Sequence, residues 1–212
     1  MKLLPLLLLA PALAHASWFD FEAGIGVARS KGMGDGVWVQ RGVPGSHEQL
    51  RTPTYLAGVT GDLTEHLAWH ADYVYFGGLS AGVRGVPDEN YNPRTHQVVG
   101  TPTHYGVFNG QGHTQGVMLT IEPHVTYRGL RFGAEAGPFL YWATWHESLD
   151  GLDGNHYNLS HKTVPQVGAV AGVSVGAADW KVAYRYFYQR ASGNPYPGMV
   201  TGTHMLMLEK RW

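Results

Sequence analysis

Hydrophobic and polar residues alternate with a period of two in eight segments of the chain. In one of them Trp69 and Tyr73 fall on one face, whereas His70 and Asp72 fall on the other. The eight segments are residues 19–27, 55–60, 67–76, 117–126, 132–142, 166–175, 180–189 and 204–212. Successive side chains of a β-strand point to opposite faces. The pattern therefore predicts eight strands and an all-β fold.

Formal charge is confined to one face of these predicted strands, with one exception. The apolar face carries only Lys210, close to the C-terminus. The other face carries Asp20, Glu22, Asp72, Glu122, Glu135, Lys181, Arg185, Glu209 and Arg211. A charge that faces lipid at mid-membrane costs about 2–4 kcal/mol, whereas a soluble barrel or sandwich would turn its apolar face inward. We therefore expect an eight-stranded antiparallel transmembrane β-barrel.

The predicted connections alternate between short and long. The short ones are residues 62–66, 127–130 and 176–179. The long ones, rich in Gly, Pro, Asn and His, are residues 30–52, 80–113, 143–162 and 190–202. In bacterial barrels the short turns face the periplasm and the long loops face the exterior. Aromatic residues gather near both ends of the predicted strands, as expected for rings that lie at headgroup level.

The first sixteen residues have the three-part plan of a secretory signal peptide. Lys2 gives a basic start, residues 3–13 are mostly apolar, and Ala14 and Ala16 are the small residues that a signal peptidase reads. The apolar run is shorter than the roughly 20 residues that a membrane-spanning helix needs. We expect residues 1–16 to be removed and residues 17–212 to form one barrel domain in the outer membrane of a Gram-negative cell.

The composition agrees with an exported barrel. The chain has no cysteine, 29 glycines in 212 residues and a formal net charge of −1. An exported chain without cysteine cannot rely on disulfides, so a closed hydrogen-bonded ladder must hold the fold. A net charge near zero argues against a nucleic-acid partner, which requires a basic patch.

Several inward charges fall on neighbouring strands if the barrel closes from the first strand to the eighth. They are Glu122, Glu135, Lys181, Arg185, Glu209 and Arg211. The interior of an eight-stranded barrel holds only side chains or one small ligand. We expect these residues to form an ion-pair network that plugs a polar lumen. A narrow channel for small solutes is the alternative.

The predicted architecture resembles the small outer-membrane barrels of the outer membrane protein A, X and W type, within the porin-like superfamily. The resemblance covers the whole mature chain. It implies that the aromatic final residue, here Trp212, is an assembly signal read by the barrel assembly machinery. Lys210 departs from the family, which has an apolar or aromatic residue there. Pro123 and Pro138 also depart, because proline cannot donate to a ladder, and we expect both to form β-bulges.

No catalytic residue, metal or cofactor is expected. The chain has twelve histidines, but no pair has the compact spacing of structural zinc sites. His146 and Ser148 resemble part of the His-x-Ser-Asn element of outer-membrane lipid A deacylases, but Leu149 replaces the Asn. We therefore expect a structural or surface-interaction protein. Its expected partners are outer-membrane lipids, lipopolysaccharide and an extracellular molecule, and a lipid-A-modifying hydrolase is a further alternative.

Overall fold

The computed structural model describes eight ranges of the chain. They are residues 18–30, 47–86, 91–92, 97–98, 106–150, 156–162, 165–193 and 196–212. The predicted signal peptide, residues 1–16, lies outside the described residues. In the described ranges, no helix has the length and the apolar character needed to cross a membrane.

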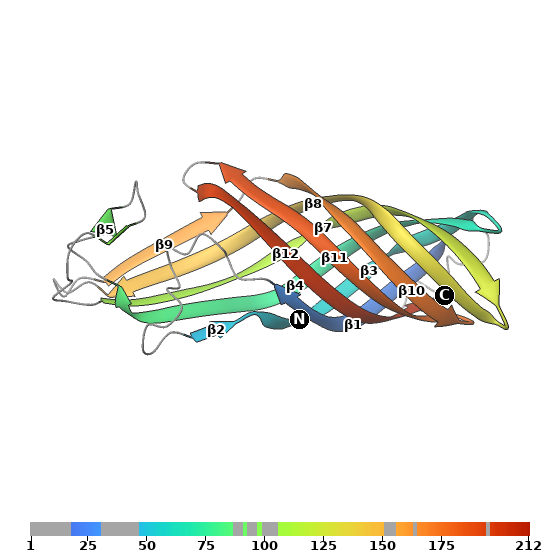
Figure 1. Cartoon of the computed structure of the whole chain (residues 1–212), viewed down its shortest axis with the longest axis horizontal. Helices are drawn as coiled ribbons and strands as arrows, with labels where there is room; N and C mark the ends of the chain where they lie inside the picture. Colours follow the sequence, from blue (N-terminus) through green and yellow to red (C-terminus); the bar gives the residue numbers. More distant parts are fainter. Residues whose placement is uncertain are drawn as a thin grey trace, which may run out of the picture.

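Eight long strands form a closed antiparallel barrel (Figure 1). They are β1 (Asp20–Ser30), β3 (Arg51–Thr64), β4 (Leu67–Val86), β7 (Gly106–Tyr127), β8 (Leu130–Asp150), β10 (Gln166–Ala177), β11 (Trp180–Gly193) and β12 (Tyr196–Arg211). Each strand pairs with the next in this order, and β12 pairs with β1 to close the ring. A closed ladder leaves no free sheet edge. The predicted fold class is confirmed.

The barrel has two different ends. Tight connections join β3 to β4, β7 to β8 and β10 to β11 at one end, where β1 also begins and β12 also ends. We call this the turn end and the opposite one the loop end. Arg128, Gly129 and Ala178 in the last two tight turns have positive φ angles of 51°, 79° and 50°. Hairpin turns with this backbone twist match the twist of the strands that they join.

Three strands continue beyond the others at the loop end. β4, β7 and β8 have 20, 22 and 21 residues, whereas β1 has 11 and β10 has 12. Two short strands pair with them there: β2 (His47–Gln49) with β4, and β9 (His156–Lys162) with β8. We call these parts, on the left of Figure 1, the extension. A separate short pair, β5 (Tyr91–Asn92) and β6 (Gln97–Val98), lies between β4 and β7 in the sequence.

The extension corrects two of the predicted long connections. The described residues within 80–113 and 143–162 are mostly paired strand, as in the pairs Arg84–Val107 and Gly110–Glu147. The prediction used apolar alternation to delimit strands. Alternation is imposed by lipid, whereas backbone pairing between neighbouring strands continues without it. The segments outside the membrane are rich in Gly, His and Gln and do not alternate. The sequence pattern therefore did not show that they are strands.

The outer face of the barrel is apolar. Ile25, Leu119, Val173 and Leu206 point outward and are 64%, 54%, 57% and 51% exposed. Inward-pointing charges such as Arg185 are fully buried. A soluble barrel has the opposite arrangement, and so large an apolar surface marks contact with lipid. The predicted orientation of the two faces is confirmed, and the outer face is that of an outer-membrane barrel.

The predicted bulges at Pro123 and Pro138 are wrong. Pro123 pairs in register with Leu67, and Pro138 pairs in register with Ala169. A bulge adds one residue to one strand and so changes the pairing offset, but β7 and β8 keep the same offset on both sides of the prolines. The β7–β8 ladder instead omits individual pairs near them. Both proline rings are exposed on the outer face, where they displace no inward side chain.

Candidate functional site in the barrel lumen

The lumen consists of two layers. The layer toward the loop end is apolar and consists of Ala28, Leu56, Val74, Phe76, Met118, Phe139, Tyr141, Val170, Phe187, Met205 and Met207. The layer toward the turn end holds the buried charges. Along β4, for example, the inward residues change from His70 and Asp72 to Val74 and Phe76. The buried charges of the lumen therefore lie in the half at the turn end.

Three phenylalanines fill the centre of the apolar layer. The Phe76 and Phe187 rings lie 5.0 Å apart, the Phe139 and Phe187 rings 4.9 Å, and the Phe76 and Phe139 rings 6.0 Å. All three contacts are edge-to-face, the geometry that the charge distribution of aromatic rings favours. Tyr141 stacks on Phe139 at 5.4 Å. These rings come from β4, β8 and β11 and meet across the lumen.

Arg185 is the centre of the charged layer. It is fully buried and extends from β11 toward two carboxylates on other strands. Its Nε lies 2.6 Å from Glu135 Oε1, and its guanidinium donates to Glu209. Thr120 also donates to Glu135, at 3.2 Å. A buried arginine is tolerated in an apolar surrounding only when it is paired and hydrogen-bonded in this way.

A second group of contacts continues from Glu209 toward the turn end. Lys181 Nζ lies 3.1 Å from Glu209 and 3.0 Å from Glu22 Oε2. The other oxygen of Glu22 lies 2.7 Å from Nδ1 of His70. Nε2 of His70 faces Glu122 at 3.4 Å. The contacts therefore connect five strands, β11, β12, β1, β4 and β7, around the lumen.

The rim of the turn end carries further ion pairs, one of which reaches Glu122 of the charged layer. Arg131 binds Glu122, with Nε and a terminal nitrogen 3.1 Å and 2.9 Å from the same oxygen. Arg211 binds Asp20 at 2.5 Å and Asp62 at 2.9 Å. Arg131 also reaches Asp62 at 3.5 Å. These pairs are partly exposed to solvent, unlike those around Arg185.

The structure thus brings together most of the residues expected in the network. Glu135, Lys181, Arg185 and Glu209 are in direct contact. Glu122 joins them through residues that the expected set omitted, and Arg211 lies apart at the rim. The omitted members are Glu22, His70, Asp72 and Arg131. Alternation already placed the first three on the inward face, but it could not show at which height of the barrel each one lies.

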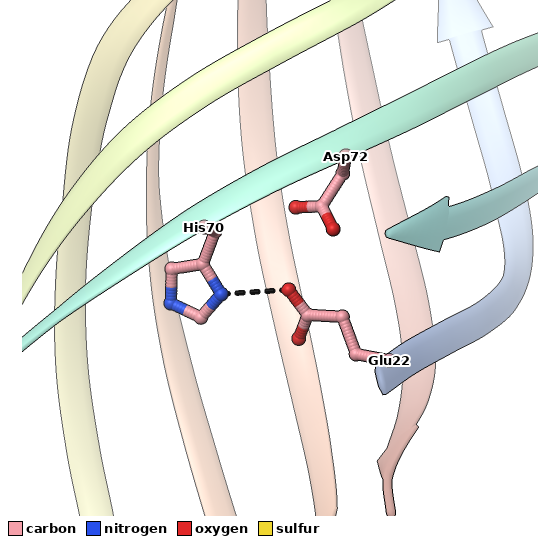
Figure 2. A group of neighbouring side chains, drawn as sticks. All are labelled: Glu22, His70 and Asp72. Atoms are coloured by element: carbon pink, nitrogen blue, oxygen red, sulfur yellow. Dashed lines mark hydrogen bonds and ion pairs between the residues drawn. The ribbon is translucent and has the colours of Figure 1, made fainter. Parts of the chain in front are cut away.

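Glu22, His70 and Asp72 form a compact group inside the charged layer (Figure 2). Each offers one ligand atom, and these atoms all lie within 4.8 Å of one another. The side chains are 3%, 3% and 0% exposed. Glu22 and His70 are hydrogen-bonded, whereas neither oxygen of Asp72 has a hydrogen-bond partner among the described residues. A buried carboxylate without a partner is costly in free energy.

A pocket open to solvent reaches this group from the turn end. It has a volume of about 60 Å³, and Glu22, His70, Glu122 and Lys181 are part of its lining. Trp180, Lys210 and Arg211 lie at its rim on the same side. Water and small ions can therefore reach the charged layer without passing through the apolar layer.

Trp212 and Lys210 lie together on the outside of the turn end. The backbone N–H of Trp212 donates to the Phe21 carbonyl at 2.9 Å, and the side chain is 47% exposed. Lys210 Nζ lies 5.4 Å from the Trp212 ring and 5.5 Å from the Trp180 ring. Cation–π contact at headgroup level explains how a lysine is accommodated on the lipid-facing side.

The remaining histidines divide between the lumen and the extension. His70 and His124 point into the barrel, as predicted, and are 3% and 7% exposed. His146 and Ser148 lie on the part of β8 that pairs with β9, and His146 is exposed. The two deacylase-like residues are therefore outside the charged layer and far along the extension.

Comparison with known proteins gives structural matches only. No protein-family model and no curated protein sequence matches the chain. Ail, the attachment invasion locus protein of Yersinia pestis, solved with sucrose octasulfate, is 11% identical with a TM-score of 0.47, and the match covers 92% of this chain and 100% of that one. The outer membrane protein OprG of Pseudomonas aeruginosa is 10% identical with a TM-score of 0.44, covering 92% and 95%. Neisserial surface protein A is 11% identical with a TM-score of 0.37, covering 92% and 98%.

These TM-scores are below 0.5, so the fold is established by the chain's own closed ladder and apolar outer face. That ladder confirms, in architecture, the predicted resemblance to small eight-stranded outer-membrane barrels.

Proposed function

We propose that this chain is a non-conducting outer-membrane barrel that presents the extension to the cell exterior as an interaction surface. The observation that carries the proposal is the excess length of three strands. A transmembrane β-strand needs about 9–11 residues, whereas β4, β7 and β8 have 20, 22 and 21. Each therefore continues roughly ten residues beyond the lipid, which anchoring does not require.

The lumen supports the non-conducting part of the proposal. Phe76, Phe139 and Phe187 meet at its centre and are at most 3% exposed. Arg185 and its carboxylates fill the next level toward the turn end. An ion that crosses the barrel would have to displace both layers. This favours the plugged barrel over the narrow channel.

The orientation can be tested by labelling, because the natural chain has no cysteine. Asn109→Cys and Asn158→Cys place an exposed thiol on the extension, and Glu65→Cys and Asp179→Cys place one at the turn end. On intact cells, an impermeant maleimide should label the first two variants and not the second two. Labelling of only the turn-end pair would reverse the orientation and remove the exterior surface.

The interaction role can be tested by shortening the extension at positions that are paired. Ala81 pairs with Gly110, and Trp145 pairs with His161. Replacing residues 82–109 and residues 146–160 by Asn-Gly turns, which suit two-residue hairpins, leaves the barrel ladder intact. Cells with the shortened chain should lose retention on matrix-coated surfaces. Equal retention of cells with either chain, both folded in the membrane, would refute the interaction role.

A further inference from the structure

The charged layer contains more carboxylates than cations. Its five acidic side chains are Glu22, Asp72, Glu122, Glu135 and Glu209, and its cations are Arg131, Lys181 and Arg185. Each of the carboxylates other than Asp72 contacts at least one of these cations. Without the proton that Glu22 and Nδ1 of His70 share, and with every carboxylate ionised, the layer carries two uncompensated negative charges. Charges in a low-dielectric interior require compensation.

Asp72 is the carboxylate of the layer that forms no ion pair with these cations. Its carboxylate is fully buried, and neither oxygen has a hydrogen-bond partner among the described residues. It points toward Glu22 and His70 (Figure 2). Glu135 and Glu122, which also lie near His70, are held by Arg185 and Arg131. Within the group of Asp72, Glu22 and His70, one carboxylate is therefore held by no cation.

These three side chains are a suitable donor set for a metal ion. Two carboxylate oxygens and one imidazole nitrogen bind Zn²⁺ and related divalent transition metals, and three protein ligands leave a position for water. The ligand atoms lie within 4.8 Å of one another, so small side-chain rotations bring them to coordination distance. The other oxygen of Glu22 stays with Lys181.

The surroundings of His70 also fit a metal ligand. Metal-binding histidines usually donate their second ring N–H to a carboxylate, which fixes the ring orientation. Nε2 of His70 faces Glu122 at 3.4 Å, and Glu122 is itself held by Arg131 at 2.9 Å. Nδ1 is then directed toward Glu22 and Asp72. Glu122, His70 and the carboxylates of Glu22 and Asp72 thus lie in the order expected of an outer carboxylate, a histidine ligand and two further ligands.

We propose that Glu22, His70 and Asp72 bind one divalent transition-metal ion of the Zn²⁺ class inside the barrel. The ion enters from the turn end, where the open pocket reaches Glu22 and His70. It takes the place of the proton between Glu22 and Nδ1 of His70, and that proton leaves to solvent. Its two positive charges compensate the excess of the charged layer.

Titration calorimetry with Zn²⁺ on the untagged, folded, full-length barrel in detergent tests this site. We expect the wild type to bind one more ion than Asp72→Asn and His70→Gln, or to bind it at least tenfold more tightly. His124→Gln is the matched control for histidine, because His124 is also buried in the lumen but lies outside the proposed donor set, with its Nδ1 3.3 Å from the Glu122 carbonyl. Asp62→Asn, at the rim, is the control for aspartate. Both controls should bind as the wild type does.

A second readout covers the case in which His70→Gln does not fold. Co²⁺ bound by these three ligands in a site of low coordination number absorbs strongly in the visible range, and Asp72→Asn should abolish that band. The proposal is overturned if Asp72→Asn binds Zn²⁺ with the stoichiometry and affinity of the wild type, or if the wild type binds no more Zn²⁺ than the two variants. Protons would then supply the missing charge.

Discussion

Arg185 is the residue on which the pairing of the buried charges depends most. It is fully buried between Glu135 and Glu209, which are 4% and 1% exposed, so little surface remains through which water could hydrate the three charges. Arg211 carries the same charge on the neighbouring strand but lies at the rim, where its partners Asp20 and Asp62 are partly exposed. Burial rather than charge distinguishes the two arginines.

We therefore predict a large stability difference between Arg185→Met and Arg211→Met. Removing Arg185 leaves the buried Glu135 without its cation and Glu209 with Lys181 alone, and an uncompensated buried charge costs about 3–5 kcal/mol. Removing Arg211 breaks partly exposed pairs, which are worth about 1 kcal/mol or less. Urea unfolding of the purified barrel in liposomes measures both. Arg185→Met combined with Glu209→Met should recover part of the loss, and equal urea midpoints for Arg185→Met and the wild type would mean that the charged layer is hydrated.

For Asp72 we predict the opposite effect of a substitution on stability. In a buffer with chelator, Asp72→Asn should unfold at a urea concentration at least as high as the wild type, because the change removes a buried charge that has no hydrogen-bond partner among the described residues. Glu209→Gln is the comparison, since Glu209 is equally buried but paired with Arg185 and Lys181. Loss of stability in both variants would show that Asp72 has a partner in the free protein.

At the scale of the element, alternation predicted the strands well only where lipid imposes it. The inward face of β4, from Ala68 to Phe76, was read correctly from the sequence. The ten residues after Phe76 were not, because they lie beyond the lipid and keep only their backbone pairing. At Pro123 and Pro138 the sequence predicted bulges that are not present. Both rings point outward and interrupt single ladder bonds without a register shift.

The contacts of the lumen site depend on pairing between strands, which a single sequence does not show. His70 and Asp72 are two residues apart on β4, and alternation places both inside. Their contact with Glu22 depends on the register of two ladders, β1–β3 and β3–β4. Together these registers place Glu22 of β1 and Asp72 of β4 at the same height of the barrel. The inward positions were therefore predictable and the cluster was not.

β12 is the element on which assembly is expected to depend. The backbone of Trp212 bonds to Phe21 at 2.9 Å, so the last residue already belongs to the closing seam between β12 and β1. Deleting Trp212 should lower the fraction of folded, heat-modifiable protein in outer-membrane preparations while leaving the urea midpoint of the folded fraction nearly unchanged. Lys210→Tyr is the control and should assemble as well as the wild type or better. Normal accumulation of the deletion variant would exclude Trp212 as an assembly signal.

At the scale of the whole molecule, the two layers of the lumen divide the barrel into parts with different access. The charged layer communicates with solvent at the turn end through the pocket that reaches Glu22 and Lys181. The apolar layer, with Phe76, Phe139 and Phe187 at its centre, separates that pocket from the loop end. The lumen is thus open to solvent at the turn end and closed by the apolar layer toward the loop end.

This asymmetry predicts the electrical behaviour of the barrel. The wild type should show no discrete conductance steps in a planar bilayer, because an ion would have to leave water and pass between packed aromatic rings. The triple variant Phe76→Ala, Phe139→Ala, Phe187→Ala removes those rings at one level and should show small steps. Leu119→Ala, which shortens an exposed side chain on the lipid-facing surface, is the matched control and should stay silent. Conductance steps in the wild type at neutral pH would establish a continuous water path and favour the channel over the plugged barrel.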